Sequence, residues 1–96
     1  METMLVFNIN PELEEDMVDY LLEHECITGF TSYPVRGHGL YKNMNLAEQV
    51  SGRRKAIQLE ILIGRNDIKA IIAGLKENVG SGISYWEQQI MNTGRT

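Results

Sequence analysis

The sequence predicts one α+β domain over residues 1–96: a four-stranded antiparallel sheet with two helices on one face, in the order βαββαβ. Two observations carry this prediction. Residues 4–9 are typical of a strand, and apolar and polar residues alternate over residues 54–63, as they do in strands that bury one face. Residues 11–25 and 67–78 carry apolar residues at helical spacing. Two helices cover only one face of such a sheet, so the other face needs a different cover.

The first strand and the first helix follow directly from the chain up to residue 25. Asn10 is a favoured N-cap residue, and Pro11 suits the first helical position. The acidic residues that follow complement the helix dipole. The strand is expected to face the helices with Leu5, Phe7 and Ile9. The helix carries five residues on one side at helical spacing: Leu13, Met17, Tyr20, Leu21 and His24.

The second and third strands enclose a long polar loop. The second strand is expected over residues 29–35, and Pro34 places it at a sheet edge because proline cannot donate to a strand ladder. The loop covers about residues 37–53. In the third strand one face is expected to carry Ile57, Leu59, Ile61 and Ile63, and the other Ala56, Gln58 and Glu60.

The last third of the chain predicts a helix, a tight turn and a strand. The helix over residues 67–78 is expected to bury Ile68, Ile71, Ile72 and Leu75. A turn at residues 80–82 leads into a strand over residues 83–90, where Tyr85 and Trp86 point to opposite faces. The complete order is that of the ferredoxin-like sandwich.

The face of the sheet away from the helices is expected to be a subunit interface. It would carry apolar residues from two strands, with Gln58 and Glu60 among them: Met4, Val6, Ala56 and Leu62. A domain of 96 residues buries a modest share of its surface, and oligomerisation is a common remedy. The sequence therefore favours an oligomer.

Composition narrows the classes of function. Cys26 is the single cysteine, so no internal disulfide forms, and no apolar run is long enough to span a membrane. The first residues lack the features of a signal peptide, and a cytoplasmic protein is expected. The net charge is −4, and all Lys and Arg residues lie from residue 36 onward. No broad basic surface is expected, which argues against nucleic-acid binding.

Several short motifs occur in an order that resembles the PII signal-transduction family. That family has a V-K-G-x-G element before a long loop, and an E-x-V element after it. It also has a glycine turn and an R-T-G tail. The matching residues are Val35, Arg36, Gly37 and Gly39, then Glu48 and Val50, then Gly80 to Ile83, and Asn92 to Gly94.

The resemblance implies a homotrimer whose sheets line its interior and whose loop contacts a protein target. It also implies a small molecule or ion bound between subunits, near Gly37, His38 and Gly39. Some PII-like proteins are linked to membrane transporters or to metal efflux. The residues that would line the ligand site, from the loop ends and the glycine turn, are Gly37, His38, Gly39, Arg53, Arg54, Gly80 and Gly82.

The nucleotide site of the family is not matched. Leu40 and Tyr41 stand where the family has an Arg-Gln pair, and Ile90 and Asn92 stand where its tail has two arginines. The glycine turn is short and has no lysine after it. A triphosphate needs several positive charges and backbone donors, so ATP is not expected as the ligand, which stays unidentified.

Metal binding is the alternative, as in the trimeric CutA proteins, which share this fold and are linked to metal tolerance. His38, between two glycines, can bind a transition metal, or can be a solvated loop residue. His24 and Cys26 form an H-x-C pair that can hold copper or zinc. The preferred interpretation of Cys26 is a buried small apolar side chain. Arg53, Arg54 and Lys55 can bind an anion or pair with a neighbour's acidic helix.

Nothing in the sequence predicts catalysis. His24 and His38 are far apart in the chain, and no nucleophile lies in a signature context. No P-loop, dinucleotide fingerprint or metalloprotease spacing occurs. The leading hypothesis is therefore a non-enzymatic PII-like regulator, the second a CutA-like metal-binding protein, and the third a small ferredoxin-like enzyme.

Overall fold

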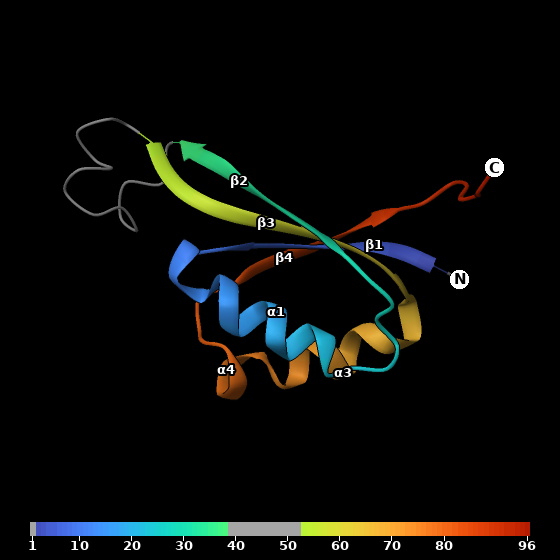
Figure 1. The fold of residues 1–96 in the computed structure, drawn as a ribbon, viewed down its shortest axis with the longest axis horizontal. Helices are drawn as coiled ribbons and strands as arrows, with labels where there is room; N and C mark the ends of the chain where they lie inside the picture. Colours follow the sequence, from blue (N-terminus) through green and yellow to red (C-terminus); the bar gives the residue numbers. More distant parts are fainter. Residues whose placement is uncertain (1, 39–52) are drawn as a thin grey trace.

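The computed structural model of the protein describes residues 2–38 and 53–96, and it confirms the α+β fold with one antiparallel sheet. The four strands lie in the order β2-β3-β1-β4 (Figure 1). They are β1 (Glu2–Ile9), β2 (Thr31–His38), β3 (Arg53–Gly64) and β4 (Ser84–Gln89). The helices are η1 (Pro11–Leu13), α1 (Glu14–Leu22), η3 (Arg65–Asp67), α3 (Ile68–Ala73) and α4 (Leu75–Asn78).

The helices of the described residues all lie on one side of the sheet, and the core fills the space between helices and sheet (Figure 1). The predicted inward faces are confirmed, because the alternating apolar residues of β1 and β3 are buried there against α1, α3 and α4. The core residues of the two central strands are Leu5, Phe7, Ile9, Ile57, Leu59, Ile61 and Ile63. Because side chains alternate along a strand, the residues between these core positions point to the opposite face of the sheet, away from the helices.

The first helix begins as predicted and ends earlier. The Asn10 side-chain oxygen accepts a hydrogen bond from the Glu12 amide at 3.0 Å, and Pro11 opens the first turn. The helix ends at Leu22 rather than near Glu25. Beyond it the chain turns so that Ile27 reaches the core, with 7% of its surface exposed. Burial of Ile27 therefore sets the end of α1.

The second predicted helix is broken into α3 and α4 at Gly74. The cause is a contact with α1, where the buried Tyr20 hydroxyl donates a hydrogen bond to the Ile71 carbonyl at 2.7 Å. This hydroxyl lies so close to Gly74 that a side chain at that position would collide with it. The two helices still bury Ile68, Ile71 and Leu75 as expected, and Ile72 is partly buried.

Strands β2 and β3 extend further than predicted and project beyond the helices (Figure 1). They pair over eight positions, from Thr31 opposite Glu60 to His38 opposite Arg53. Gly37, His38 and Arg53, expected in the loop, therefore belong to strands. The rest of the predicted loop, residues 39–52, lies outside the described residues. The expectation that Pro34 lies on an edge strand is confirmed, because β2 is at the edge of the sheet.

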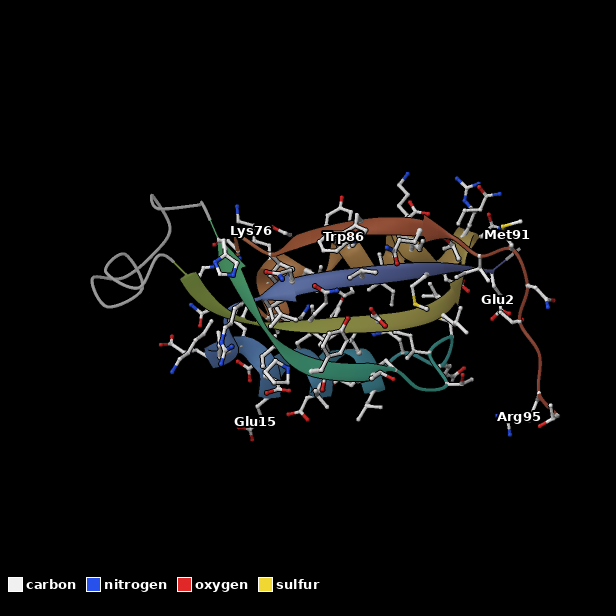
Figure 2. The ribbon with its side chains drawn as sticks, turned by 90° about the horizontal axis from the view of Figure 1, so that it is seen from above. Glu2, Glu15, Lys76, Trp86, Met91 and Arg95 are labelled. Carbon is white, nitrogen blue, oxygen red and sulfur yellow. The ribbon has the colours of Figure 1, made fainter. Side chains whose placement is uncertain are left out.

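The other face of the sheet has no layer over it among the described residues, and Figure 2 looks onto it. We call it the open face. It carries the side chains of β1 and β3 that alternate with the core residues, and their register partners on β2 and β4. Among the helices of residues 2–38 and 53–96, none has the length and apolar character to cross a membrane.

Candidate functional site

The predicted ligand-site residues at the end of the β2–β3 ribbon lie on two different faces. Gly37 pairs with Arg54, and both belong to the open face. His38 is the next residue of an extended strand, so it belongs to the helix side, as does Arg36. Gly39 lies outside the described residues. The structure thus brings Gly37 to Arg54 and separates both from His38.

Arg54 is the charged residue of the open face at this end. Its Nη2 donates a hydrogen bond to the Asn8 side-chain oxygen at 2.9 Å. The side chain runs along Gly37, where an added Cβ would lie 3.7 Å from the arginine Nε. That Nε is buried and has no hydrogen-bond partner among the described residues. A buried donor of this kind normally has an acceptor, so this position suits an incoming anion or carbonyl.

A second polar group on the open face is fully paired. The Tyr33 hydroxyl donates to the Glu60 carboxylate at 2.6 Å, and the Gln58 side-chain amide donates to the Tyr33 oxygen at 3.1 Å. The hydrogen bond to Glu60 is the main cause that raises the pKa of Tyr33, with smaller contributions from burial and from the charge of Glu60. These side chains are linked in one network and are oriented in advance for a contact across the face.

Apolar side chains surround this network. Trp86 is 40% exposed and Leu62 is 38% exposed, although both are large and apolar. Trp86, labelled in Figure 2, lies opposite Val6, which is only 1% exposed. On the other side of β4, Tyr85 lies opposite Phe7, with ring centroids 6.3 Å apart. The prediction that Tyr85 and Trp86 point to opposite faces is confirmed.

The glycine turn before β4 lies at the same end of the sheet as Gly37, because Ser84 pairs with Asn8 there. Gly82 has a φ of +75°, which favours glycine over any other residue. Gly80 approaches Leu13, where an added Cβ would lie 3.4 Å from its methyl groups. The turn and Gly37 are nevertheless at opposite edges, with β1 and β3 between them. One chain therefore does not bring the two glycine elements together.

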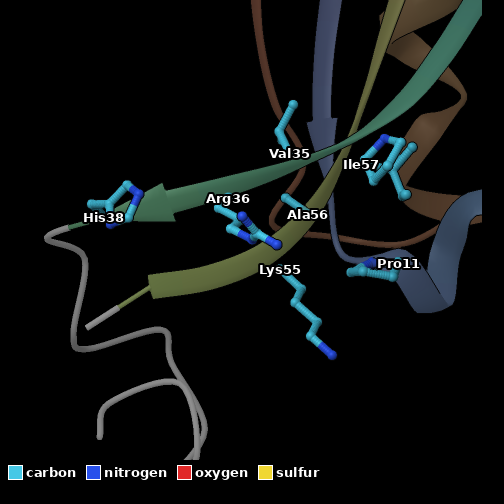
Figure 3. Close-up of a pocket in the computed structure, with 8 residues that line it drawn as sticks. Pro11, Val35, Arg36, His38, Lys55, Ala56 and Ile57 are labelled. Carbon is cyan, nitrogen blue, oxygen red and sulfur yellow. The ribbon is translucent and has the colours of Figure 1, made fainter. Parts of the chain in front are cut away.

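On the helix side of the ribbon there is a groove of about 760 Å³. It forms where β2 and β3 extend past the start of η1 (Figure 3). Arg36, His38 and Lys55 supply its polar lining, and none of the described residues that line it is acidic. The sequence did not indicate this groove, because Arg36 and Lys55 become neighbours only through the strand register.

The two metal-binding candidates lie at different ends of the molecule. α1 begins near the projecting end of the ribbon, where His38 is, and runs toward the other end, where His24 and Cys26 follow it (Figure 1). His24 Nδ1 is 2.8 Å from the Tyr20 carbonyl oxygen, and its ring lies edge-on to the Tyr20 ring. The prediction that Cys26 is buried is wrong. Cys26 is exposed, because the next residue, Ile27, takes the buried position.

No three His, Cys, Asp or Glu side chains of the described residues gather as a metal site would require. Either candidate would need further ligands from beyond this part of a single chain. Metal binding stays a prediction.

Comparison with known proteins places the chain in a family. A family model described as "Protein of unknown function (DUF3240)" matches residues 1–96. The chain belongs to the DUF3240 family. The crystal structure of a DUF3240 family protein from Shewanella baltica OS155 is similar to it, with a TM-score of 0.79 and 23% sequence identity. The match covers 99% of this chain and 96% of that chain, and it shows a shared fold. A search of curated proteins finds no significant match.

Within this DUF3240 fold, the predicted ligand-site residues that the structure describes lie near one end of the sheet but do not form one group. Gly37 and Arg54 lie together on the open face, Gly80 and Gly82 lie at the far edge, and His38 is on the helix side. Arg53 begins β3 and pairs with His38 through the backbone. The length of β2 was not predicted. Had the strand been continued to His38, its alternating side chains would have placed His38 and Gly37 on opposite faces.

Proposed function

We propose that this protein is a non-enzymatic cytoplasmic regulator of PII-like type. In this proposal three copies associate through their open faces, and a small molecule or ion other than ATP binds between subunits near Gly37 and Arg54. The chain between β2 and β3 contacts a target protein, which we propose to be a membrane transporter or a metal-efflux component. The ligand would change how that segment meets the target.

The open face is the observation that carries the proposal. Trp86 and Leu62 expose large apolar surfaces on it, and all six residues of β4 are exposed. Singly exposed apolar residues are common on monomers, but here they border the paired network of Tyr33, Glu60 and Gln58 on one sheet face. A face that combines large apolar side chains with satisfied polar groups resembles a subunit interface.

The placement of the glycine elements supports a ring of subunits. Gly37 and the turn at Gly80 and Gly82 lie at the same end of the sheet but at opposite edges. In a cyclic assembly each copy meets its neighbour through two different surface patches, so one copy's β2 edge can face the next copy's β4 edge. A ligand bound there would be in reach of the Arg54 guanidinium, whose Nε has no partner in the described part of one chain.

The mass of the purified protein in solution tests the assembly. We expect a particle of three times the 10.9 kDa chain mass, measured by light scattering after size exclusion or by native mass spectrometry. Trp86→Glu puts a charge into the proposed interface and should give monomers, since burying an unpaired charge is costly.

Leu22→Glu is the matched control. Leu22 is even more exposed, at 62%, but it lies at the end of α1, away from the open face. This variant should keep the trimer mass. A wild-type protein that stays monomeric at high concentration would rule out the proposed assembly, and equal behaviour of the two variants would remove the open face as its interface.

A further inference from the structure

The groove on the helix side of the β2–β3 ribbon is a site separate from the proposed cleft between subunits. Its charged residues, Arg36 and Lys55, alternate along their strands with Gly37 and Arg54, so the two pairs lie on opposite faces of the ribbon. The described residues that line it belong to η1, β2 and β3, and its volume of about 760 Å³ is in the range of small-molecule sites.

Two cations are held side by side in this groove. Arg36 and Lys55 are direct partners in the antiparallel pair, and like charges in that position repel each other. No hydrogen bond or ion pair joins the Arg36 guanidinium to another described residue, and Arg36 is exposed. His38, two residues further along β2, lies at the end of the same groove. The Arg36 guanidinium is therefore placed to pair with an anion that enters the groove.

The rest of the lining is apolar. Ile57 lies at the base of the groove and is 9% exposed, while Pro11 and Pro34 are exposed beside it. Figure 3 shows Lys55 and Arg36 on the side of the ribbon that faces Pro11, with Val35 pointing to the other side. A ligand that reaches the cations from this side also meets proline rings and an isoleucine. An inorganic anion would leave these apolar surfaces uncovered.

We propose that this groove binds a small organic acid that has one carboxylate on an apolar body. The carboxylate pairs with the planar guanidinium of Arg36, on the side of the ribbon that also carries Lys55, and the body covers Pro11, Pro34 and Ile57. This site goes beyond the proposed regulatory function, since it needs neither the trimer nor the cleft near Gly37.

A titration of the full-length protein, followed through its backbone amides by NMR, tests the chemistry. The probe is 4-phenylbutyrate, with its uncharged amide, 4-phenylbutyramide, and inorganic phosphate as comparisons. We expect 4-phenylbutyrate to shift the amide signals around Arg36, Lys55 and Ile57 in a saturable way. The uncharged amide should bind about tenfold more weakly, because it cannot form a charge-assisted pair. Phosphate should also bind more weakly, because it leaves the apolar surface bare.

Arg36→Gln keeps a polar side chain and removes the charge, and should weaken 4-phenylbutyrate binding about five- to tenfold. Lys76→Gln removes an exposed charge from α4, outside the groove, and should leave the affinity unchanged. Equal affinity for the acid and its amide, equal affinity for phosphate, or no localised shifts at millimolar probe would each overturn the proposal. So would an Arg36→Gln variant that binds as well as Lys76→Gln.

The same titration separates this proposal from the trimer proposal. The Trp86→Glu variant changes the open face and none of the groove residues. It should bind 4-phenylbutyrate with wild-type affinity, whatever its mass in solution. Loss of binding in that variant, with the fold retained, would show that the groove depends on assembly and would overturn its placement within one chain.

Discussion

Tyr33 illustrates how a single hydrogen bond sets the charge state of the open face. Its hydroxyl donates to the Glu60 carboxylate and accepts from Gln58, so the phenol proton is held by a negatively charged acceptor. Removing the proton would place two negative charges at hydrogen-bonding distance. This hydrogen bond is the largest cause that raises the pKa of Tyr33 above the ordinary value of a tyrosine. The open face is therefore sensitive to alkaline pH.

Stability should fall at alkaline pH more steeply in the wild type than in Tyr33→Phe. The pKa of Tyr33 is higher in the folded state, so the unfolded chain loses this proton first. The contribution is fully present below the unfolded value of about 10 and is lost as the pH rises through the folded pKa. Urea denaturation at several pH values from neutral to alkaline measures the difference between the two proteins.

Tyr85→Phe is the control for that comparison, because its hydroxyl makes no hydrogen bond to a carboxylate among the described residues. This variant should keep the steeper alkaline loss of the wild type. If Tyr33→Phe and the wild type lose stability in parallel above about pH 10, the hydrogen bond to Glu60 does not raise the pKa of the Tyr33 hydroxyl in the folded protein.

Single residues also mark where prediction from sequence stops. Cys26 and Ile27 are adjacent apolar residues after a helix, and composition alone does not say which is buried. The structure buries Ile27 and exposes Cys26, since the turn after Leu22 has room to direct one of them inward. Gly37 and His38 present the same difficulty, because their faces depend on how far β2 continues. Such choices follow from tertiary contacts rather than local preference.

The break between α3 and α4 is a contact between helices far apart in the chain. Tyr20 on α1 fills the space beside Gly74 and bonds to the Ile71 carbonyl in the last turn of α3. The local sequence favours one helix over residues 67–78, because its isoleucines and Leu75 form one apolar stripe at helical spacing. The strands were predictable from alternation, whereas this break was not, since its cause lies on another helix.

Gly74→Ala should destabilise the protein even though alanine is the better helix former. In an exposed helix this change would stabilise by about 0.5–1 kcal/mol. Here the new methyl group meets the Tyr20 hydroxyl, and overpacking of this kind costs about 1–3 kcal/mol. The free energy of unfolding from urea denaturation gives the sign directly.

A second substitution shows whether the contact with the Tyr20 hydroxyl is the reason that Gly74→Ala destabilises the protein. Tyr20→Phe alone should cost about 1 kcal/mol, because the Ile71 carbonyl loses its partner. In the Tyr20→Phe background Gly74→Ala should be tolerated better than in the wild type, giving a favourable coupling. Gly29→Ala, where an added Cβ meets nothing within 4 Å, is the control. A stabilising Gly74→Ala in the wild type would contradict the account.

The molecule as a whole presents two separate surfaces at this end of the sheet. The groove of Arg36 and Lys55 lies on the helix side of the ribbon, while the glycine elements of the open-face end are at opposite edges of the sheet. The proposed cleft would therefore form only through association, and ligand binding there would be linked to the number of chains. Gly37 and the glycine turn, which the sequence motifs single out, are thus not joined into one site by a single chain.

The melting temperature should depend on protein concentration if folding and assembly are linked. When three unfolded chains form one folded trimer, a hundredfold rise in chain concentration adds two-thirds of RT ln 100, or about 1.8 kcal/mol per chain. For a domain of this size that corresponds to a rise in Tm of several degrees. Thermal unfolding followed by circular dichroism at about 2 µM and about 200 µM measures it.

Two variants make this measurement specific to the open face. Trp86→Glu should lower Tm and remove its dependence on concentration, because its folded state is the monomer. Leu22→Glu, on the exposed end of α1, should keep the dependence of the wild type. A wild-type Tm that is equal at both concentrations would mean that the chain is stable alone, with Trp86 and Leu62 facing water. The open face would then need an explanation other than association.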